Sequence, residues 1–140
     1  MSSNILVPVD LDVAGSWEQA LSTAAGFAKA QGANLHLLSV IPAGPAVLSQ
    51  YVPGGYEELV SGKVAAELDK LKAGLDVESG KVTTSVRFGG VYQEILAYAD
   101  KVGADLIVIG SHKPGVADYL LGSNASRVVR HAPCSVFVVR

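Results

Sequence analysis

The chain is poor in the residue types that mark several classes of protein. Only 17% of its 140 residues are charged, 6% are aromatic, and one is a cysteine, Cys134. A single cysteine excludes an intrachain disulfide, and its position among apolar residues is typical of a buried, unreactive thiol. These features favour a reducing compartment, and we expect a cytoplasmic protein.

No apolar run approaches the roughly 18 residues that a membrane-spanning helix needs. Residues 1–4 lack the positive charge of a signal peptide, and Asp10 and Asp12 follow the first apolar run closely. A net charge of −2 offers no basic face to nucleic acid and no polybasic patch to a membrane. Metal-ligating side chains do not cluster along the sequence. We therefore expect no nucleic-acid partner, no membrane partner and no resident metal site.

Apolar residues, which make up 49% of the chain, are arranged in short segments. Continuous or alternating apolar runs are typical of sheet strands, and they predict strands at residues 5–9, 34–40, 82–87, 106–109 and 135–139. Between these strands, apolar residues recur at helical spacing and predict a helix in each interval. The alternation of strand and helix indicates one domain in which a parallel sheet carries helices on both faces.

The first predicted helix carries signals at both ends. Ser16 and Gln19 have the spacing of a capping box, in which two side chains satisfy the first N–H groups of a helix. Gly32 follows the last apolar position of the stripe, and glycine commonly ends a helix. Elsewhere, His36 within the second strand and His131 near the end of the last helix are expected to be structural.

A glycine-containing loop directly follows the fourth predicted strand. It begins at Gly110 and leads to a helix start marked by Gly122 and Ser123. Glycines allow a ligand to approach the backbone closely, and the first N–H groups of a helix have no partners within the helix. The segment therefore has the features of an anion-binding cradle. An ordinary turn capped by Ser123 fits the same residues equally well.

The position of Asp10, after the first strand, favours a ligand site. Parallel sheets of this class bind ligands outside the carboxyl ends of the strands, at the point where the strand order reverses. If the first and fourth strands are central neighbours, Asp10 and the loop that begins at Gly110 converge on one crevice. An acid beside an anion cradle suits a nucleoside phosphate, although Asp10 as a simple turn residue is the alternative.

Four separated motifs resemble the universal stress protein family: residues 7–10, 106–112, 121–124 and 130–136. The resemblance covers the whole chain, residues 1–140. It implies a Rossmann-like fold of the adenine nucleotide alpha hydrolase type, with a doubly wound, five-stranded parallel sheet of order 3-2-1-4-5. It also implies the ATP-binding branch of the family, in which the acid after the first strand sits at the adenosine and the glycine loop holds the ribose and phosphates.

The loop departs from the family's pattern, Gly-x2-Gly-x9-Gly-Ser/Thr. Gly110 and the pair Gly122–Ser123 match, but Lys113 occupies the middle glycine position and the last glycine comes one residue early. The loop resembles a short-loop variant with a histidine and a proline inside it. His112 is a candidate phosphate contact or a loop cap. Lys113 is a solvated loop charge or a second phosphate contact.

The resemblance implies a nucleotide site formed by the ends of three strands, the loop and the following helix. Its residues are Pro8, Val9, Asp10, Val40, Ile109, Gly110, Ser111, His112, Lys113, Gly122, Ser123 and Asn124. The expected cofactor is ATP, and any Mg²⁺ would arrive with the nucleotide. No Ser-His-acid arrangement can be assigned, so we predict no catalytic residue and at most slow ATP turnover or self-phosphorylation.

Two functional classes remain open at this point. One is an ATP-binding module for signalling or stress response, which Gly110 and the pair Gly122–Ser123 favour. The other is a nucleotide-free dimeric interaction protein. The last strand, Ser135–Val139, is nearly all apolar, and the family topology places it at an edge of the sheet. An uncovered edge invites pairing, so the resemblance implies a homodimer through this strand.

Overall fold

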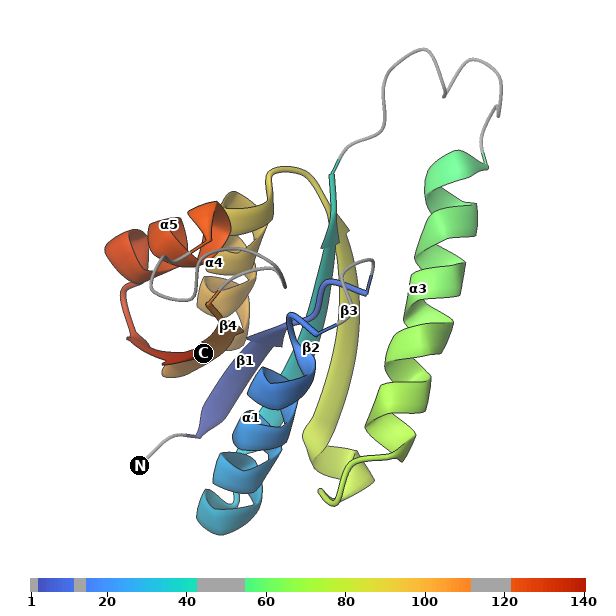
Figure 1. The fold of residues 1–140 in the computed structure, drawn as a ribbon. Helices are drawn as coiled ribbons and strands as arrows, with labels where there is room; N and C mark the ends of the chain where they lie inside the picture. The colour runs from blue at the N-terminus through green and yellow to red at the C-terminus, as the bar shows by residue number, and fades with distance from the viewer. Residues whose placement is uncertain (1–2, 12–14, 43–54, 112–121) are drawn as a thin grey trace.

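The computed structural model describes residues 3–11, 15–42, 55–111 and 122–140. Strands and helices alternate along these ranges as the sequence predicts (Figure 1). The elements, in chain order, are β1 (Asn4–Pro8), α1 (Glu18–Gln31), β2 (Asn34–Ile41), α3 (Tyr56–Ala73), the short 3-10 helix η1 (Ser79–Lys81), β3 (Val82–Phe88), α4 (Val91–Val102), β4 (Leu106–Gly110), α5 (Ser123–His131) and β5 (Ser135–Val139). None of these helices is long and apolar enough to cross a membrane.

The strands form one parallel sheet of order β3-β2-β1-β4-β5, which confirms the expected topology. In the centre of the sheet, Leu6 of β1 pairs with His36 of β2 on one side and with Ile107 of β4 on the other. The chain reverses its direction of travel across the sheet between β1 and β4. This Rossmann-like arrangement places the switch point at the carboxyl ends of β1 and β4.

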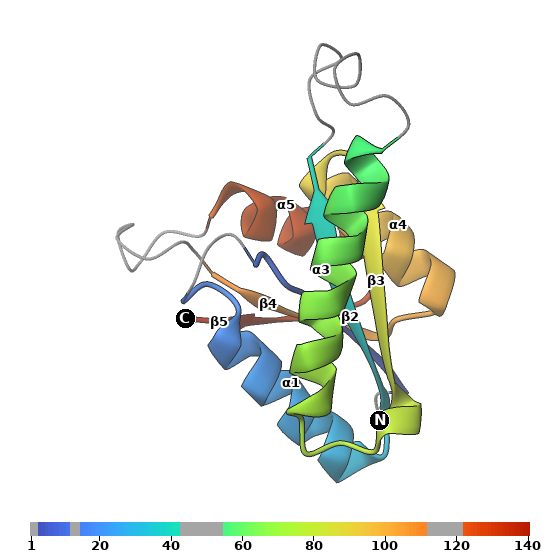
Figure 2. The same cartoon turned by 90° about the vertical axis from the view of Figure 1, so that its right-hand side faces the viewer.

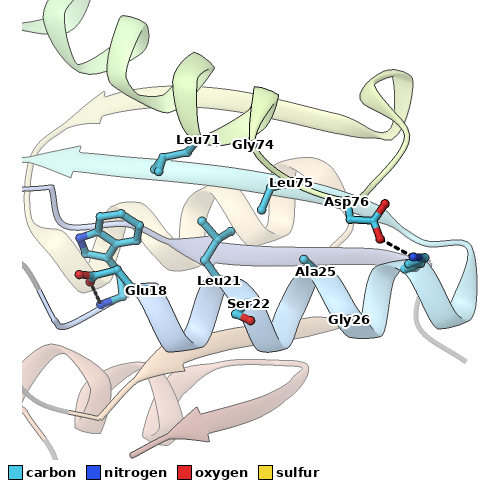
Figure 3. A pocket seen from close by; sticks show the side chains of 11 residues that line it. Glu18, Leu21, Ser22, Ala25, Gly26, Leu71, Gly74, Leu75 and Asp76 are labelled. Carbon is cyan, nitrogen blue, oxygen red and sulfur yellow. Dashed lines mark hydrogen bonds and ion pairs between the residues drawn. The ribbon is translucent and has the colours of Figure 1, made fainter.

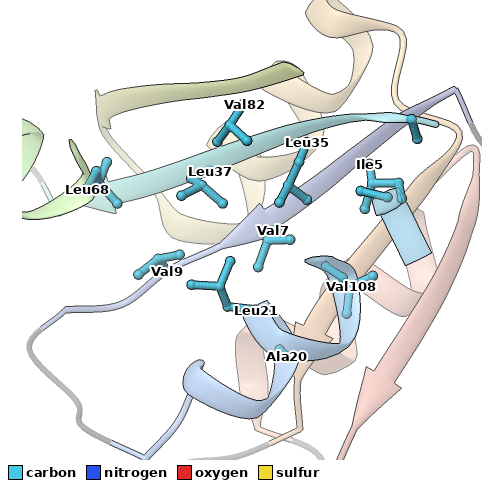
Figure 4. Packing of buried hydrophobic residues seen from close by; sticks show 13 residues of the cluster. Ile5, Val7, Val9, Ala20, Leu21, Leu35, Leu37, Leu68, Val82 and Val108 are labelled. Atoms are coloured by element: carbon cyan, nitrogen blue, oxygen red, sulfur yellow. The ribbon is translucent and has the colours of Figure 1, made fainter. Parts of the chain in front are cut away.

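Helices cover both faces of the sheet, with α1 and α3 on one face and α4 and α5 on the other (Figure 2). Successive side chains of a strand point to opposite faces, so a strand covered on both faces must be apolar throughout. Figure 4 shows the core on the first face, where Val7 of β1 and Leu21 of α1 meet. The core on the second face contains Leu6, Leu38, Ile107, Ile95 and Val128, all nearly fully buried.

The start of α1 differs from the prediction. The capping box of Ser16 and Gln19 is wrong, because the helix begins at Glu18 and neither side chain caps it. Instead, the Glu18 carboxylate accepts hydrogen bonds from the backbone N–H of Gly15, at 2.8 Å, and of Trp17, at 3.3 Å. A carboxylate is a stronger acceptor than a hydroxyl and is also favoured by the positive end of the helix dipole. The hydrogen bond from Gly15 accordingly lowers the pKa of Glu18.

The end of α1 matches the prediction, and helix α3 is less deeply buried than α1. Gly32 ends α1 in the left-handed conformation, with φ of 66°, as predicted. Helix α3 lies over β3 and is more loosely buried than α1. Among the side chains of α3 that the structure describes, only Leu68 is fully buried, whereas Leu59 is 58% exposed. The position of α3 on the sheet therefore depends strongly on one residue.

Candidate functional site

A cleft of about 370 Å³ lies at the carboxyl ends of β1 and β2. Five of the predicted site residues line it: Pro8, Val9, Asp10, Val40 and Asn124. They come from the ends of β1 and β2 and from the first turn of α5, so the fold brings together segments far apart in the sequence. The sequence analysis expects a ligand between the first and fourth strands, whereas this cleft lies on the β2 side of β1 and none of the predicted residues Ile109, Gly110 and Ser111 lines it.

The chemistry of the cleft is that of a small-molecule site. Most of its lining side chains are apolar, and the polar ones are Asp10, Ser39 and Asn124. The Ser39 hydroxyl is buried and donates a hydrogen bond to the backbone carbonyl of Val9 at 2.9 Å, which fixes the ends of β1 and β2 against each other. Asp10 is exposed at the mouth. Apolar walls with a few placed polar groups are typical of sites that bind a flat, partly polar ligand.

The sequence analysis missed eight of the residues that line the cleft, and three of these lie on helices that it did find. Val64 of α3 and Val91 and Ile95 of α4 form walls of the cleft. The helical stripes correctly mark these residues as facing the sheet. A periodic pattern does not show how far a helix extends beyond the strand ends, so it does not separate residues that line a cleft from residues that fill the core.

Gly110 lies close to a different segment from the one expected. A Cβ atom at this position would lie 1.9 Å from the backbone carbonyl oxygen of Ser16, at the start of α1. Gly110 and Ser111 line a smaller cavity of about 160 Å³ together with Gly15 and Ser16. The requirement for glycine here therefore comes from the protein's own backbone, whereas the sequence analysis attributed it to a ligand.

The two ends of the loop after β4 meet at Ser111. Its buried backbone N–H donates to the carbonyl of Val139 at 2.8 Å, and its carbonyl accepts a hydrogen bond from the N–H of Gly122. Gly110, Ser111 and Gly122 are thereby brought together, but none of them lines the cleft that holds Asp10. Residues 112–121 lie outside the described ranges, and with them the predicted contacts His112 and Lys113. Ile109 is buried in the core on the second face, directly before this junction.

Within the part of the chain that the structure describes, helix α5 starts without a side-chain cap. Gly122 occupies the N-cap position and Ser123 is the first helical residue, so the interpretation of Ser123 as the N-cap is wrong. Gly122 has φ of −61° and ψ of 156°, a conformation that any residue can adopt. The glycine is therefore not required by backbone strain. An uncapped helix start next to Asn124 leaves N–H groups that suit an anion at this end of the cleft.

His36 has structural contacts, as the sequence indicates, whereas Cys134 is only partly buried and not fully buried as expected. His36 Nδ1 lies 2.7 Å from the Thr83 hydroxyl and Nε2 lies 3.0 Å from Asn4 Oδ1, so the ring links β2 to both neighbouring strands. Burial lowers the pKa of His36. Burial, followed by the nearby carboxylate of Asp105, raises the pKa of the Cys134 thiol, which disfavours the reactive thiolate.

A second concavity, of about 500 Å³, lies between α1 and α3 (Figure 3). Leu21 of α1 and Leu75, which follows α3, point toward one another across it, and an ion pair between Lys29 and Asp76 lies at one end. None of the predicted site residues lines this groove. No group of three or more potential metal ligands occurs within the described ranges. The cleft at the strand ends is therefore the better candidate site.

Comparison with known proteins agrees with this architecture. The sequence model of the universal stress protein family matches residues 1–140. The chain belongs to this family. Universal stress protein G of Escherichia coli O157:H7 is 35% identical over 144 aligned residues, which cover 100% of both chains. Universal stress protein MJ0531 of Methanocaldococcus jannaschii is 33% identical over 126 residues, which cover 87% of this chain and 74% of the relative.

Solved universal stress proteins share the fold over nearly the whole chain. Universal stress protein UspA from Lactobacillus plantarum is 29% identical with a TM-score of 0.76, and the match covers 99% of this chain and 97% of that one. A universal stress protein in complex with cAMP is 18% identical with a TM-score of 0.74, covering 99% and 97% of the two chains. At that identity the second likeness concerns the fold alone.

Proposed function

We propose that this universal stress protein binds ATP and acts in the cytoplasm as a nucleotide-dependent signalling or stress-response module. The observation that carries the proposal is the cleft at the carboxyl ends of β1 and β2, where Asp10, Val40 and the first turn of α5 meet. Its apolar walls suit a purine ring, and the Asp10 carboxylate suits ribose hydroxyls as an acceptor. Another universal stress protein of the same fold has been solved in complex with a nucleotide, cAMP.

The lining residues support binding more than turnover. Asp10 is the one titratable side chain among the described residues that line the cleft. Efficient hydrolysis needs a group that positions or activates water beside the phosphates, and an exposed carboxylate at the adenosine end does not supply it. The N–H groups at the start of α5 would hold phosphate oxygens, and Mg²⁺ bound to ATP would neutralise part of their charge. We therefore propose at most slow ATP turnover.

The test of this proposal is the substitution Gly122→Val. Valine can adopt the backbone conformation of Gly122, so the fold should survive, but its branched side chain would stand in front of the N–H groups of α5. We expect ATP affinity to fall roughly 10- to 100-fold, the loss of one or two hydrogen bonds to a charged group. Asp10→Ala should weaken ATP less. Isothermal titration calorimetry measures both effects.

Gly80→Val is the matched control, because Gly80 lies in η1, away from the cleft, and has open space around it. This variant should bind ATP as the wild type does. Unchanged ATP affinity in a folded Gly122→Val variant would contradict the assigned site. A wild-type protein that binds no ATP in calorimetry and carries none in native mass spectrometry would instead support the nucleotide-free alternative.

We also propose a homodimer that forms through the edge of β5. In the described sheet, β5 has a neighbour on its β4 side only. Phe137 of this strand is 44% exposed and packs edge-to-face on Phe27 of α1, with ring centroids 5.1 Å apart. An apolar edge strand is a template for pairing, and antiparallel pairing of two β5 strands about a two-fold axis would cover it.

Phe137→Lys should convert the dimer to a monomer, because the added charge would have to be buried at the centre of the paired strands. Leu59→Lys is the control, since Leu59 is also exposed and lies on α3, which packs on β3 at the opposite edge of the sheet. Sedimentation velocity at micromolar concentration distinguishes the species. A monomeric wild type, or a dimer that survives Phe137→Lys, would refute this interface.

A further inference from the structure

A cation lies beside the cleft, on the side formed by α4 and α5. Arg127 of α5 places its guanidinium carbon 5.2 Å from the centre of the Tyr92 ring of α4. The His131 ring also stacks on Tyr92, with centroids 6.0 Å apart and planes inclined by 24°. Val91 and Asn124 line the cleft. Tyr92 directly follows Val91 in the sequence, and Arg127 comes three residues after Asn124. The Arg127–Tyr92 pair is therefore at the rim of the proposed nucleotide site.

Arg127 stacks on an aromatic ring and has no acidic partner among the described residues, in contrast to Arg87 and Lys29. Arg87 donates from Nε to Glu94 at 2.8 Å, and Lys29 pairs with Asp76. No described carboxylate forms an ion pair with Arg127, and its side chain is exposed. An aromatic ring attracts the face of a guanidinium and leaves its N–H donors free to bind an anion. The ring also restricts the motion of the side chain, which reduces the entropy lost on binding.

We propose that Arg127 contacts the phosphate groups of the bound nucleotide and makes the site selective for nucleoside di- and triphosphates. The inference rests on the proposed nucleotide function and adds a residue outside the strand ends and the glycine loop. Asn124 and Arg127 lie on neighbouring positions of one helix face, because residues three apart are adjacent on a helix surface. A guanidinium forms two parallel hydrogen bonds with phosphate oxygens, whereas adenosine offers it no anion.

The experiment compares Arg127→Ala with Arg130→Ala. Arg130 is on the same helix and is also exposed, and its substitution removes the same charge. It is not beside a residue that lines the cleft. Calorimetric titrations with ATP, ADP, cAMP and adenosine give the selectivity. We expect Arg127→Ala to weaken ATP about tenfold and to leave adenosine within about twofold, the loss of one charge-assisted contact. Arg130→Ala should leave all four ligands near wild-type affinity.

Two variants of Tyr92 test the role of the ring. Tyr92→Phe keeps the aromatic face and should retain ATP affinity, whereas Tyr92→Leu removes it and should weaken ATP more than adenosine. Raising the salt concentration should reduce the difference between wild type and Arg127→Ala, because salt screens an exposed charge. The Tyr92 variants should keep their far-UV circular dichroism spectra, since the ring is only partly buried.

The outcomes separate this inference from the function on which it rests. Equal losses of ATP and adenosine affinity in Arg127→Ala, or no loss of either, would overturn the phosphate contact while leaving nucleotide binding intact. An equal effect of Arg130→Ala on ATP would show a general charge effect and would also overturn it. A wild-type protein that binds none of the four ligands would overturn the proposed function, and the role of Arg127 with it.

Discussion

Gly110→Ala is expected to lower the free energy of unfolding by about 3 kcal/mol or more, the upper part of the range for overpacking. The new Cβ atom would lie 1.9 Å from the carbonyl oxygen of Ser16, far inside contact distance. The opposing atom is backbone, so no rotamer change relieves the clash, and either the start of α1 or the end of β4 must move. Both segments line the smaller cavity of about 160 Å³, whose shape should therefore change as well.

Chemical denaturation followed by fluorescence measures this effect, and Trp17 at the start of α1 is the one tryptophan of the chain. Gly26→Ala is the control, because Gly26 lies inside α1 with open space around it. Alanine at such a helix position should stabilise the protein by about 0.5–1 kcal/mol. A Gly110→Ala variant as stable as the wild type would show that the approach of Ser16 to β4 is not a feature of the folded protein.

Leu68→Ala is expected to cost about 2–5 kcal/mol, the range for truncating a fully buried leucine. Leu68 is 0% exposed and is the side chain through which α3 enters the core. Its loss should loosen α3 on the sheet. Because α3 also supplies Val64 to the cleft, the affinity for a ligand there should fall together with stability.

Leu59→Ala gives the matched comparison on the same helix. Leu59 is 58% exposed, and its truncation should change stability by no more than about 0.5 kcal/mol. Urea denaturation of the two variants and the wild type provides the three free energies. A loss below about 1 kcal/mol for Leu68→Ala would mean that α3 is held mainly by other contacts.

The strands were predictable because burial on both faces requires uninterrupted apolar sequence. The first strand was expected at residues 5–9 and is Asn4–Pro8, a difference of one residue at each end. The order of the strands came from the family resemblance, because apolar patterning does not specify which strands are neighbours. The position of Asp10 at the switch point then followed from the topology.

One error is local, and another depends on a contact between distant segments. Ser16 and Gln19 match a capping pattern, but the carboxylate of Glu18, three residues after Gly15, takes that role. Gly110 was assigned to a ligand, although the carbonyl of Ser16 is what approaches it. This second contact has no signal in local spacing. The sequence analysis did not identify Arg127 as a candidate site residue, because its position near the cleft depends on the packing of α5 against α4.

The pairing of β1 with β4 has a consequence for the order of folding during synthesis. Ile5 pairs with Leu106, and Leu6 with Ile107. Two central strands of the sheet therefore come from segments that are far apart in the sequence. Contacts this distant in sequence form slowly, because a long loop must close first. In a nascent chain that ends before residue 106, the apolar strand β1 has already been synthesised but its partner β4 has not. One edge of β1 is then exposed. The growing polypeptide is therefore most vulnerable to aggregation just before its last quarter leaves the ribosome.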